Sequence, residues 1–207
     1  MSITKGMSTP TISYVALGDS YTIGTGASPQ ESWPALIANR MKQKGVSFEL
    51  VANLGQNGWT AKDLIEYQLP VFNKIHPDYV SLLIGTNDWV QGVDAHIFEE
   101  HYIFILENIL KVVSNPQHVI IVTIPDFSIT PAGNNYSGGR DIARGLDQFN
   151  EIIKKHAKAK GFKVIDLYPL SQTMGQDVSL FAADGLHPSA KGYARWADLI
   201  ESGFMNE

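Results

Sequence analysis

The chain has 207 residues, which is long enough to bury one sizeable core, and we expect a single domain over residues 1–207. Its composition, with 44% hydrophobic and 18% charged residues, is that of an ordinary globular protein, and the net charge of -5 argues against a general nucleic-acid-binding surface. The absence of cysteine excludes disulfides and thiol chemistry.

The first ten residues lack the apolar core of a signal peptide, and a strand is predicted almost immediately after them. No apolar run approaches the ~20 residues of a membrane span. We therefore expect a cytoplasmic protein with no membrane span, or a secreted one if a leader has been removed. No repeat, linker or low-complexity segment divides the chain.

Five short apolar runs predict strands, and most of them are continuous rather than alternating. Continuous runs are typical of a parallel sheet that is buried on both faces. The predicted strands cover Ile12–Leu17, Phe48–Ala52, Tyr79–Ile84, Val119–Ile124 and Lys163–Leu167.

Helical patterns separate these strands. Ser32 is the expected N-cap of the first helix, Pro34 lies in its first turn, and Gly45 ends it. A second helix begins near Thr60 and must break or bend near Pro70. The alternation of strands and helices predicts a three-layer α/β domain with right-handed crossovers. Further helices are predicted over residues 94–113 and 140–160 and from about residue 189 onward.

The helix over Asp94–Val113 has more apolar residues than one buried face requires. Ile103, Phe104 and Leu110 fall outside the stripe that should face the sheet. Two explanations stay open, a broad contact within the monomer and a homodimer formed through this helix. The stripe itself consists of Phe98, Tyr102, Ile105, Leu106, Ile109 and Val113.

Chemically unusual segments follow every predicted strand. The carboxyl ends of parallel strands meet at one edge of a sheet, and ligands of open α/β sheets bind there. We therefore expect these segments to converge although they are far apart in the sequence. They are Gly18–Ser20, Asn53–Thr60, Gly85–Trp89, Pro125–Phe127 and, on a longer loop, Asp184–Pro188.

Ser20 directly follows the first strand. A serine hydroxyl is a poor nucleophile unless a base takes its proton, and the best base at neutral pH is a histidine held by a carboxylate. Of the six histidines, only His187 lies in a glycine–proline loop with a carboxylate, Asp184, three residues before it. Each feature has a structural alternative, because Asp184 could cap a turn, and Asp19 or Ser20 could cap a helix.

Acyl transfer also requires hydrogen-bond donors aimed at the oxygen that becomes negative. The candidates are the backbone N–H groups of Ser20 and Gly55 and the side-chain amide of Asn87. Taken singly, Gly55 is also typical of a turn and Asn87 of an N-cap. Gly24 and Gly26 favour a phosphate-binding loop only weakly, because the third glycine of the dinucleotide motif and any Gly-Lys-Ser/Thr are absent. No cofactor or metal is expected.

Taken together, these segments resemble the sequence blocks of the SGNH hydrolase superfamily, the GDSL-type esterases and lipases. The match covers residues 12 to 200 approximately, and the blocks occur in the family's order. One departure is Tyr21, which stands where leucine is frequent. The matching blocks are Gly18-Asp19-Ser20, the glycine Gly55 within Asn53–Thr60, Gly85-Thr86-Asn87-Asp88, and Asp184-Gly185-Leu186-His187-Pro188.

The resemblance implies a flavodoxin-like sheet of five parallel strands in the order 2-1-3-4-5. It implies Ser20 as the nucleophile, His187 as the base and Asp184 as the acid that orients it. It also implies an oxyanion hole formed by the N–H groups of Ser20 and Gly55 and by Asn87. The expected function is hydrolysis of small-molecule carboxylic esters through an acyl-enzyme, with thioesterase side activity left open.

Apolar residues near the expected site suit an acyl chain or a hydrophobic alcohol, and ordinary packing is their alternative role. The segment from residue 127 to 140 either covers the site or is a plain surface connection. Two other functions stay open, a carbohydrate acetyl esterase with the same machinery and a non-catalytic nucleotide- or phosphate-binding module. The expected pocket residues are Trp59, Trp89, Phe127 and Leu186.

Overall fold

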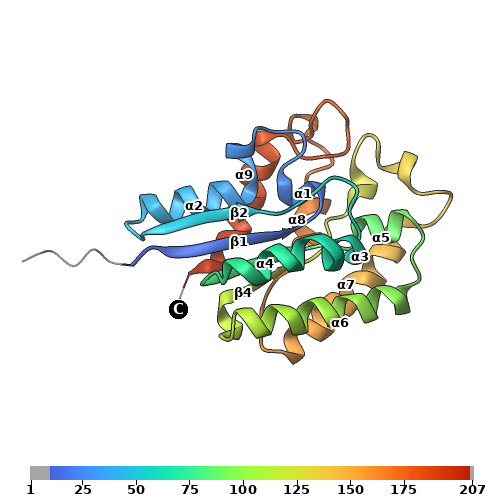
Figure 1. Ribbon diagram of the computed structural model, residues 1–207. Coiled ribbons are helices and arrows are strands. Elements are labelled where there is room, and N and C mark those ends of the chain that lie inside the picture. Colours follow the sequence, from blue (N-terminus) through green and yellow to red (C-terminus); the bar gives the residue numbers. More distant parts are fainter. Residues whose placement is uncertain (1–9, 206–207) are drawn as a thin grey trace, which may run out of the picture.

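The structure is a computed structural model that describes residues 10–205. At its centre is a five-stranded parallel sheet in the order β2-β1-β3-β4-β5, with helices on both faces (Figure 1). The three-layer α/β architecture and the strand order expected from the sequence are both confirmed. Because β1 pairs with β2 on one side and β3 on the other, the chain changes direction at β1, and such a switch point is where α/β sheets bind ligands.

The strands lie within one or two residues of the predicted ranges. The fourth ends two residues early, because Ile124 leaves the sheet and pairs with the side-chain amide of Asn150. The Ile124 N–H donates to Asn150 Oδ1 (2.8 Å), and Asn150 Nδ2 donates to the Ile124 carbonyl (2.9 Å). The strands are β1 (Ile12–Gly18), β2 (Phe48–Asn53), β3 (Tyr79–Leu83), β4 (Val119–Val122) and β5 (Lys163–Ile165).

Long helices cover the two faces of the sheet (Figure 1). One face carries α2 (Trp33–Gln43) and α9 (Ala190–Ile200). The other carries α4 (Leu69–Ile75), α6 (Ala95–Val112) and α7 (Ile142–Ala159). Short helices lie beyond the strand ends, namely α1 (Ser20–Ile23), α3 (Ala61–Asp63), α5 (Thr86–Val90) and α8 (Tyr168–Gln172).

The predicted helix ends are largely confirmed. Gly45 (φ 81°) and Gly161 (φ 73°) follow α2 and α7 in the left-handed conformation that terminates helices. Ser32 occupies the N-cap position of α2, but its hydroxyl does not cap the helix and donates instead to the Pro29 carbonyl (2.8 Å).

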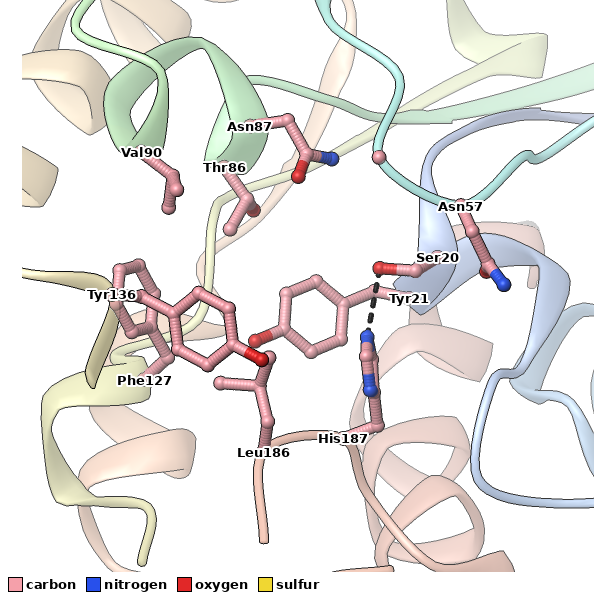
Figure 2. A pocket seen from close by; sticks show the side chains of 11 residues that line it. Ser20, Tyr21, Asn57, Thr86, Asn87, Val90, Phe127, Tyr136, Leu186 and His187 are labelled. Atoms are coloured by element: carbon pink, nitrogen blue, oxygen red, sulfur yellow. Dashed lines mark hydrogen bonds between the residues drawn. The ribbon is translucent and has the colours of Figure 1, made fainter. Parts of the chain in front are cut away.

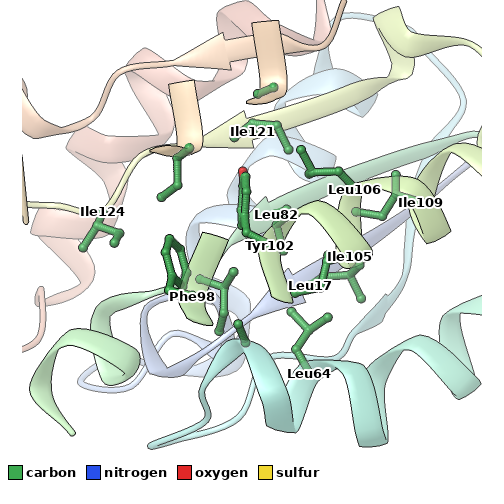
Figure 3. Packing of buried hydrophobic residues seen from close by; sticks show 14 of the residues in the cluster. Leu17, Leu64, Leu82, Phe98, Tyr102, Ile105, Leu106, Ile109, Ile121 and Ile124 are labelled. Carbon is green, nitrogen blue, oxygen red and sulfur yellow. The ribbon is translucent and has the colours of Figure 1, made fainter. Parts of the chain in front are cut away.

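Buried side chains form one core on each face of the sheet. Tyr14 and Ala16 of β1 pack with α2 and α9, whereas Val15 and Leu17 pack with the helices of the opposite face. Figure 3 shows part of the second core, with α6 side chains over the strands. The central strands β1, β3 and β4 are mostly apolar without alternation because both of their faces are buried.

The helix predicted from Thr60 is interrupted before Pro70. Residues Leu64–Gln68 form a π-helical stretch between α3 and α4, closed by a hydrogen bond from Leu69 N–H to the Leu64 carbonyl. Proline has no N–H and its ring collides with the carbonyl four residues earlier, so a regular helix cannot run through this point. The wider π turn accommodates the proline and places Gln68 in the interior.

The apolar residues of α6 that lie outside its buried stripe differ in their exposure. Leu110 packs against the core of its own chain, whereas Phe104 is 47% exposed. The homodimer through this helix stays a prediction. Within residues 10–205 no helix is both long enough and apolar enough to cross a membrane.

Candidate active site

Ser20 begins the short helix α1, two residues after the end of β1 at Gly18. Asp19 is the N-cap of this helix, and its Oδ1 accepts a hydrogen bond from Tyr21 N–H (3.0 Å). Gly18 has φ 154°, and a Cβ there would lie 2.2 Å from the Leu83 carbonyl oxygen. Only glycine therefore fits at the strand end, and the capped turn behind it fixes the direction of the Ser20 side chain.

Gln68 holds the end of β1 from the side of the π-helical stretch. Its Oε1 accepts from Gly18 N–H (3.0 Å) and its Nε2 donates to the Gly18 carbonyl (2.7 Å). The side chain is buried, so both peptide groups are satisfied away from water. The sequence did not reveal this role, because a glutamine in a helix gives no signal of a partner fifty residues away in the chain.

Ser20, His187 and Asp184 form a continuous hydrogen-bonded chain (Figure 2 shows its first link). His187 Nε2 lies 2.9 Å from Ser20 Oγ, and His187 Nδ1 lies 2.7 Å from Asp184 Oδ2. Asp184 Oδ1 also accepts from the N–H groups of Leu186 and His187. Burial acts to raise the pKa of Asp184, but the hydrogen bonds from the His187 ring and from these two amides outweigh it and lower the pKa.

The three expected oxyanion donors come from three different segments. Ser20 N–H is the first amide of α1 and has no partner within that helix. Asn87, on α5, lines the cavity beside Ser20, and its Nδ2 donates to the Trp59 carbonyl (3.0 Å), which leaves a second amide hydrogen. Gly55 N–H lies 3.2 Å from Asn53 Oδ1.

Gly55 is glycine because the surrounding backbone leaves no room for a side chain. Its φ is not positive, and a Cβ there would lie 2.6 Å from Ile23 N and 2.8 Å from the Asp19 carbonyl oxygen. The loop after β2 therefore packs directly against α1. Asn53 strengthens this contact, because its Nδ2 donates to the Thr22 carbonyl (2.8 Å).

A cavity of about 250 Å³ opens beside Ser20 and His187 (Figure 2). Phe127 and Leu186 line it, but two of the expected pocket residues, Trp59 and Trp89, do not. Trp89 points into the core, where it is buried against Phe127, and the Trp59 ring packs with Tyr67. The full lining consists of Ser20, Tyr21, Asn57, Gly58, Thr86, Asn87, Val90, Phe127, Tyr136, Leu186 and His187.

Tyr136 and Val90 line the cavity although the sequence did not predict them there, and Tyr21 was expected only as a departure from the family block. Tyr21 is buried, and its ring centroid lies 5.5 Å from that of His187. The substitution at this position therefore alters the cavity wall next to His187. Tyr136 comes from the segment between residues 127 and 140, so this segment contributes to the site.

Two buried carboxyl groups, Asp19 and Asp88, are neighbours in the chain of the candidate site residues Ser20 and Asn87. Burial raises the pKa of Asp19 to about 7 against the hydrogen bond from Tyr21 N–H, and the neighbouring Asp88 adds to the rise. Asp88 Oδ2 accepts a hydrogen bond from Ala61 N–H (2.9 Å) and thereby joins α5 to the start of α3. Neither carboxylate lines the cavity. Across residues 10–205 there is no cluster of three or more side chains that could bind a metal ion.

A family model matches most of the chain. The model of the GDSL-like lipase/acylhydrolase family covers residues 16–195. Among curated proteins, the chain is 34% identical over 133 residues to a multidomain esterase of Ruminococcus flavefaciens, an alignment that covers 62% of this chain and 16% of that protein. It is 25% identical to the spore germination lipase LipC of Bacillus licheniformis, with 93% of this chain and 96% of the lipase covered.

Solved structures have the same fold. The acetyl xylan esterase AlAXEase superposes with a TM-score of 0.75 at 21% identity, covering 94% of this chain and all of that one. TesA superposes with a TM-score of 0.73 at 18% identity, covering 93% of this chain and 97% of that one. At these identities the superpositions establish the architecture alone.

Proposed function

Because this chain belongs to the GDSL-like lipase/acylhydrolase family, within the SGNH hydrolase superfamily, we propose that it is a serine esterase that hydrolyses carboxylic esters. The observation that carries the proposal is the chain of two hydrogen bonds from Ser20 Oγ through the His187 ring to Asp184. It supplies a nucleophile, a base and the carboxylate that orients the base.

In the proposed mechanism, Ser20 Oγ attacks the ester carbonyl carbon while His187 Nε2 takes the hydroxyl proton. Asp184 fixes the ring orientation and stabilises the imidazolium that forms. The negative oxygen is stabilised by Ser20 N–H, by the free amide hydrogen of Asn87 and by Gly55 N–H, which must turn away from Asn53 to take part.

His187 then donates its proton to the departing alcohol, which leaves an acyl-enzyme on Ser20. A water molecule repeats the cycle: His187 takes its proton, the hydroxide attacks the acyl carbon, and Ser20 Oγ recovers the proton as the carboxylic acid leaves.

The cavity favours an ester over a phosphorylated ligand. Its lining contains several apolar and aromatic side chains and, among the described residues, no lysine or arginine. A nucleotide or phosphate site would need a cation or a row of backbone amides around the phosphate. The nucleotide-binding alternative therefore has less support than hydrolysis.

Replacement of Ser20 by alanine tests the proposal. We expect kcat for p-nitrophenyl butyrate to fall by at least about 10⁴-fold, since the nucleophile is lost. Ser47→Ala is the matched control, because Ser47 is exposed and directly precedes Phe48, at the end of β2 that lies away from the cavity. A serine-reactive phosphonate should label the wild type and the control but not the Ser20 variant. Undiminished turnover by Ser20→Ala would refute the mechanism.

A further inference from the structure

Residues 130–140, which we call the bridge segment, join the two walls of the cavity. Near its start, Ala132 N–H donates to the Gly185 carbonyl (2.9 Å) on the loop that carries His187. At its end, Arg140 donates to carbonyls at the end of α5, the helix that carries Asn87. Tyr136 lies between these attachments, and Figure 2 shows its ring between Val90 and Leu186.

Arg140 is the stronger of the two attachments. Its Nη1 donates to the Trp89 carbonyl (2.6 Å) and its Nη2 to the Val90 carbonyl (2.9 Å), and the guanidinium lies 4.1 Å from the centroid of the Trp89 ring. Trp89 cannot move away, because α7 packs so closely on it that a Cβ at Gly145 would lie 1.7 Å from its Nε1. The planar fork of an arginine suits this combination of stacking and two donors, and a lysine cannot reproduce it.

The turn before Arg140 sets the position of Tyr136. Gly138 (φ 57°) and Gly139 (φ 77°) both take the left-handed conformation, which reverses the chain directly after Ser137. The N–H and Nε of Arg140 both donate to the Ser137 carbonyl, at 3.0 and 3.1 Å. Arg140 therefore holds the residue next to Tyr136 as well as α5.

The wall that the bridge segment completes is suited to an alkyl chain. Val90, Phe127 and Leu186 lie around the Tyr136 ring, and the polar lining residues Asn57 and Asn87 lie nearer Ser20 (Figure 2). In the proposed mechanism the leaving alcohol must reach His187 and then solvent, whereas the acyl chain stays attached through the first step. The apolar side of the cavity therefore takes the acyl chain. The volume of about 250 Å³ lies just below the range of about 300–1,000 Å³ that is usual for ligand pockets, which favours a short acyl chain.

We propose that the bridge segment sets the acyl-chain length of this esterase: Tyr136 closes the cavity as the specificity-determining residue, and Arg140 is the positioning residue that holds it. The preferred substrates are esters of short acyl chains, of about four to six carbons. This inference rests on the proposed esterase function.

The proposal predicts a profile of activity against chain length. While each added methylene is buried, kcat/KM should rise up to about fourfold, which corresponds to about 0.8 kcal/mol per methylene. Once the chain reaches Tyr136 the rise should stop, and longer esters should lose activity through a higher KM rather than a lower kcat.

The experiment measures kcat and KM for p-nitrophenyl esters from acetate to dodecanoate. In Tyr136→Ala the ratio of kcat/KM for decanoate to that for butyrate should rise at least tenfold over the wild type. Arg140→Met should raise it at least threefold, and Arg140→Lys should raise it less than Arg140→Met. Arg144→Met is the matched control, because Arg144 is exposed on the adjoining helix α7, and its ratio should equal that of the wild type.

Thermal unfolding of each variant shows whether it is folded, and Tyr136 is 43% exposed, so its truncation should leave the fold intact. An unchanged ratio in folded Tyr136→Ala would overturn this inference and leave the esterase function standing. A changed ratio in Tyr136→Ala with none in either Arg140 variant would overturn the role of Arg140. Wild-type protein that hydrolyses no ester of the series would overturn both the inference and the proposed function.

Discussion

The two sides of the cavity are held in different ways. On the side that holds the proposed triad, which we call the reacting side, Ser20 lies on a turn that is fixed by buried contacts, with Gln68 bonded to both peptide groups of Gly18. On the far side, Tyr136 lies on a segment attached mainly through the exposed Arg140. The difference suggests a division of roles: buried contacts fix the geometry that the reaction requires, whereas surface contacts fix a wall that can change without disturbing it.

Variants of the two sides should therefore affect ester hydrolysis in different ways. Changes on the reacting side should reduce kcat for every ester, whatever the length of its acyl chain. Changes in the bridge segment should alter the order of preference among esters. A reacting-side variant that altered the preference among esters would break the distinction.

The largest further effect is expected for Asp184→Asn. The amide cannot hold the His187 ring in the orientation that accepts the Ser20 proton, so kcat should fall by about 10³- to 10⁴-fold at saturating p-nitrophenyl butyrate. Asp177→Asn provides the control, because Asp177 is also a loop aspartate with side-chain partners, but these are Ser179 and Lys191 rather than His187. A decrease of less than tenfold in Asp184→Asn would contradict the assigned role.

Asn87→Ala should have the next largest effect. Loss of one oxyanion donor typically lowers kcat about 100- to 1,000-fold. The variant also loses the hydrogen bond to the Trp59 carbonyl, so Gln91→Ala is needed as a control: Gln91 Nε2 donates to the neighbouring Gly58 carbonyl (3.1 Å) from the end of α5. Similar losses of kcat in both variants would show that the loop contact, and not the oxyanion, explains the effect.

The smallest effect is on stability and concerns Asp19. Its pKa is raised to about 7 in the folded chain, whereas an unfolded aspartate titrates near 4. Between these values the folded state binds more protons than the unfolded state, so stability should fall as the pH rises from about 4 to about 7. Asp19→Asn keeps an acceptor for Tyr21 N–H but cannot ionise, so this decline should disappear.

The measurement for Asp19 compares melting temperatures at pH 5 and pH 8. Asp19→Asn should gain several degrees relative to the wild type between the two conditions, because about 1 kcal/mol corresponds to roughly 2–4 °C for a protein of this size. Asp147→Asn, an exposed aspartate on α7, should show no such gain. A constant difference between wild type and Asp19→Asn at both pH values would contradict the proposed protonation of Asp19.

The sequence predicted those parts of the site that short spacings determine. The three-residue spacing of Asp184 and His187 was sufficient to predict that their side chains are in contact, because a tight turn brings them together. The strand end at Gly18 was also recognisable, because an apolar run stopped at glycine. The sheet followed from continuous apolar strands alternating with helices, while the order of the strands came from the resemblance to a family.

Contacts between distant segments could not be predicted in the same way. Gln68 and Arg140 act on backbone groups of other segments, and neither has a partner that sequence spacing reveals. The prediction that Trp89 lines the pocket was wrong for a geometric reason. On the short helix α5, Asn87 and Val90 face the cavity, so Trp89 between them faces the core. An aromatic residue next to a motif does not itself show which way it points.

The π-helical stretch Leu64–Gln68 limits which deletions this chain can tolerate. Deletion of one residue there would turn Gln68 by about 100° around the helix axis and away from Gly18. The serine turn would then lose its lateral support, while Pro70 would still interrupt the helix. Loss of a codon in this stretch should therefore be selected against.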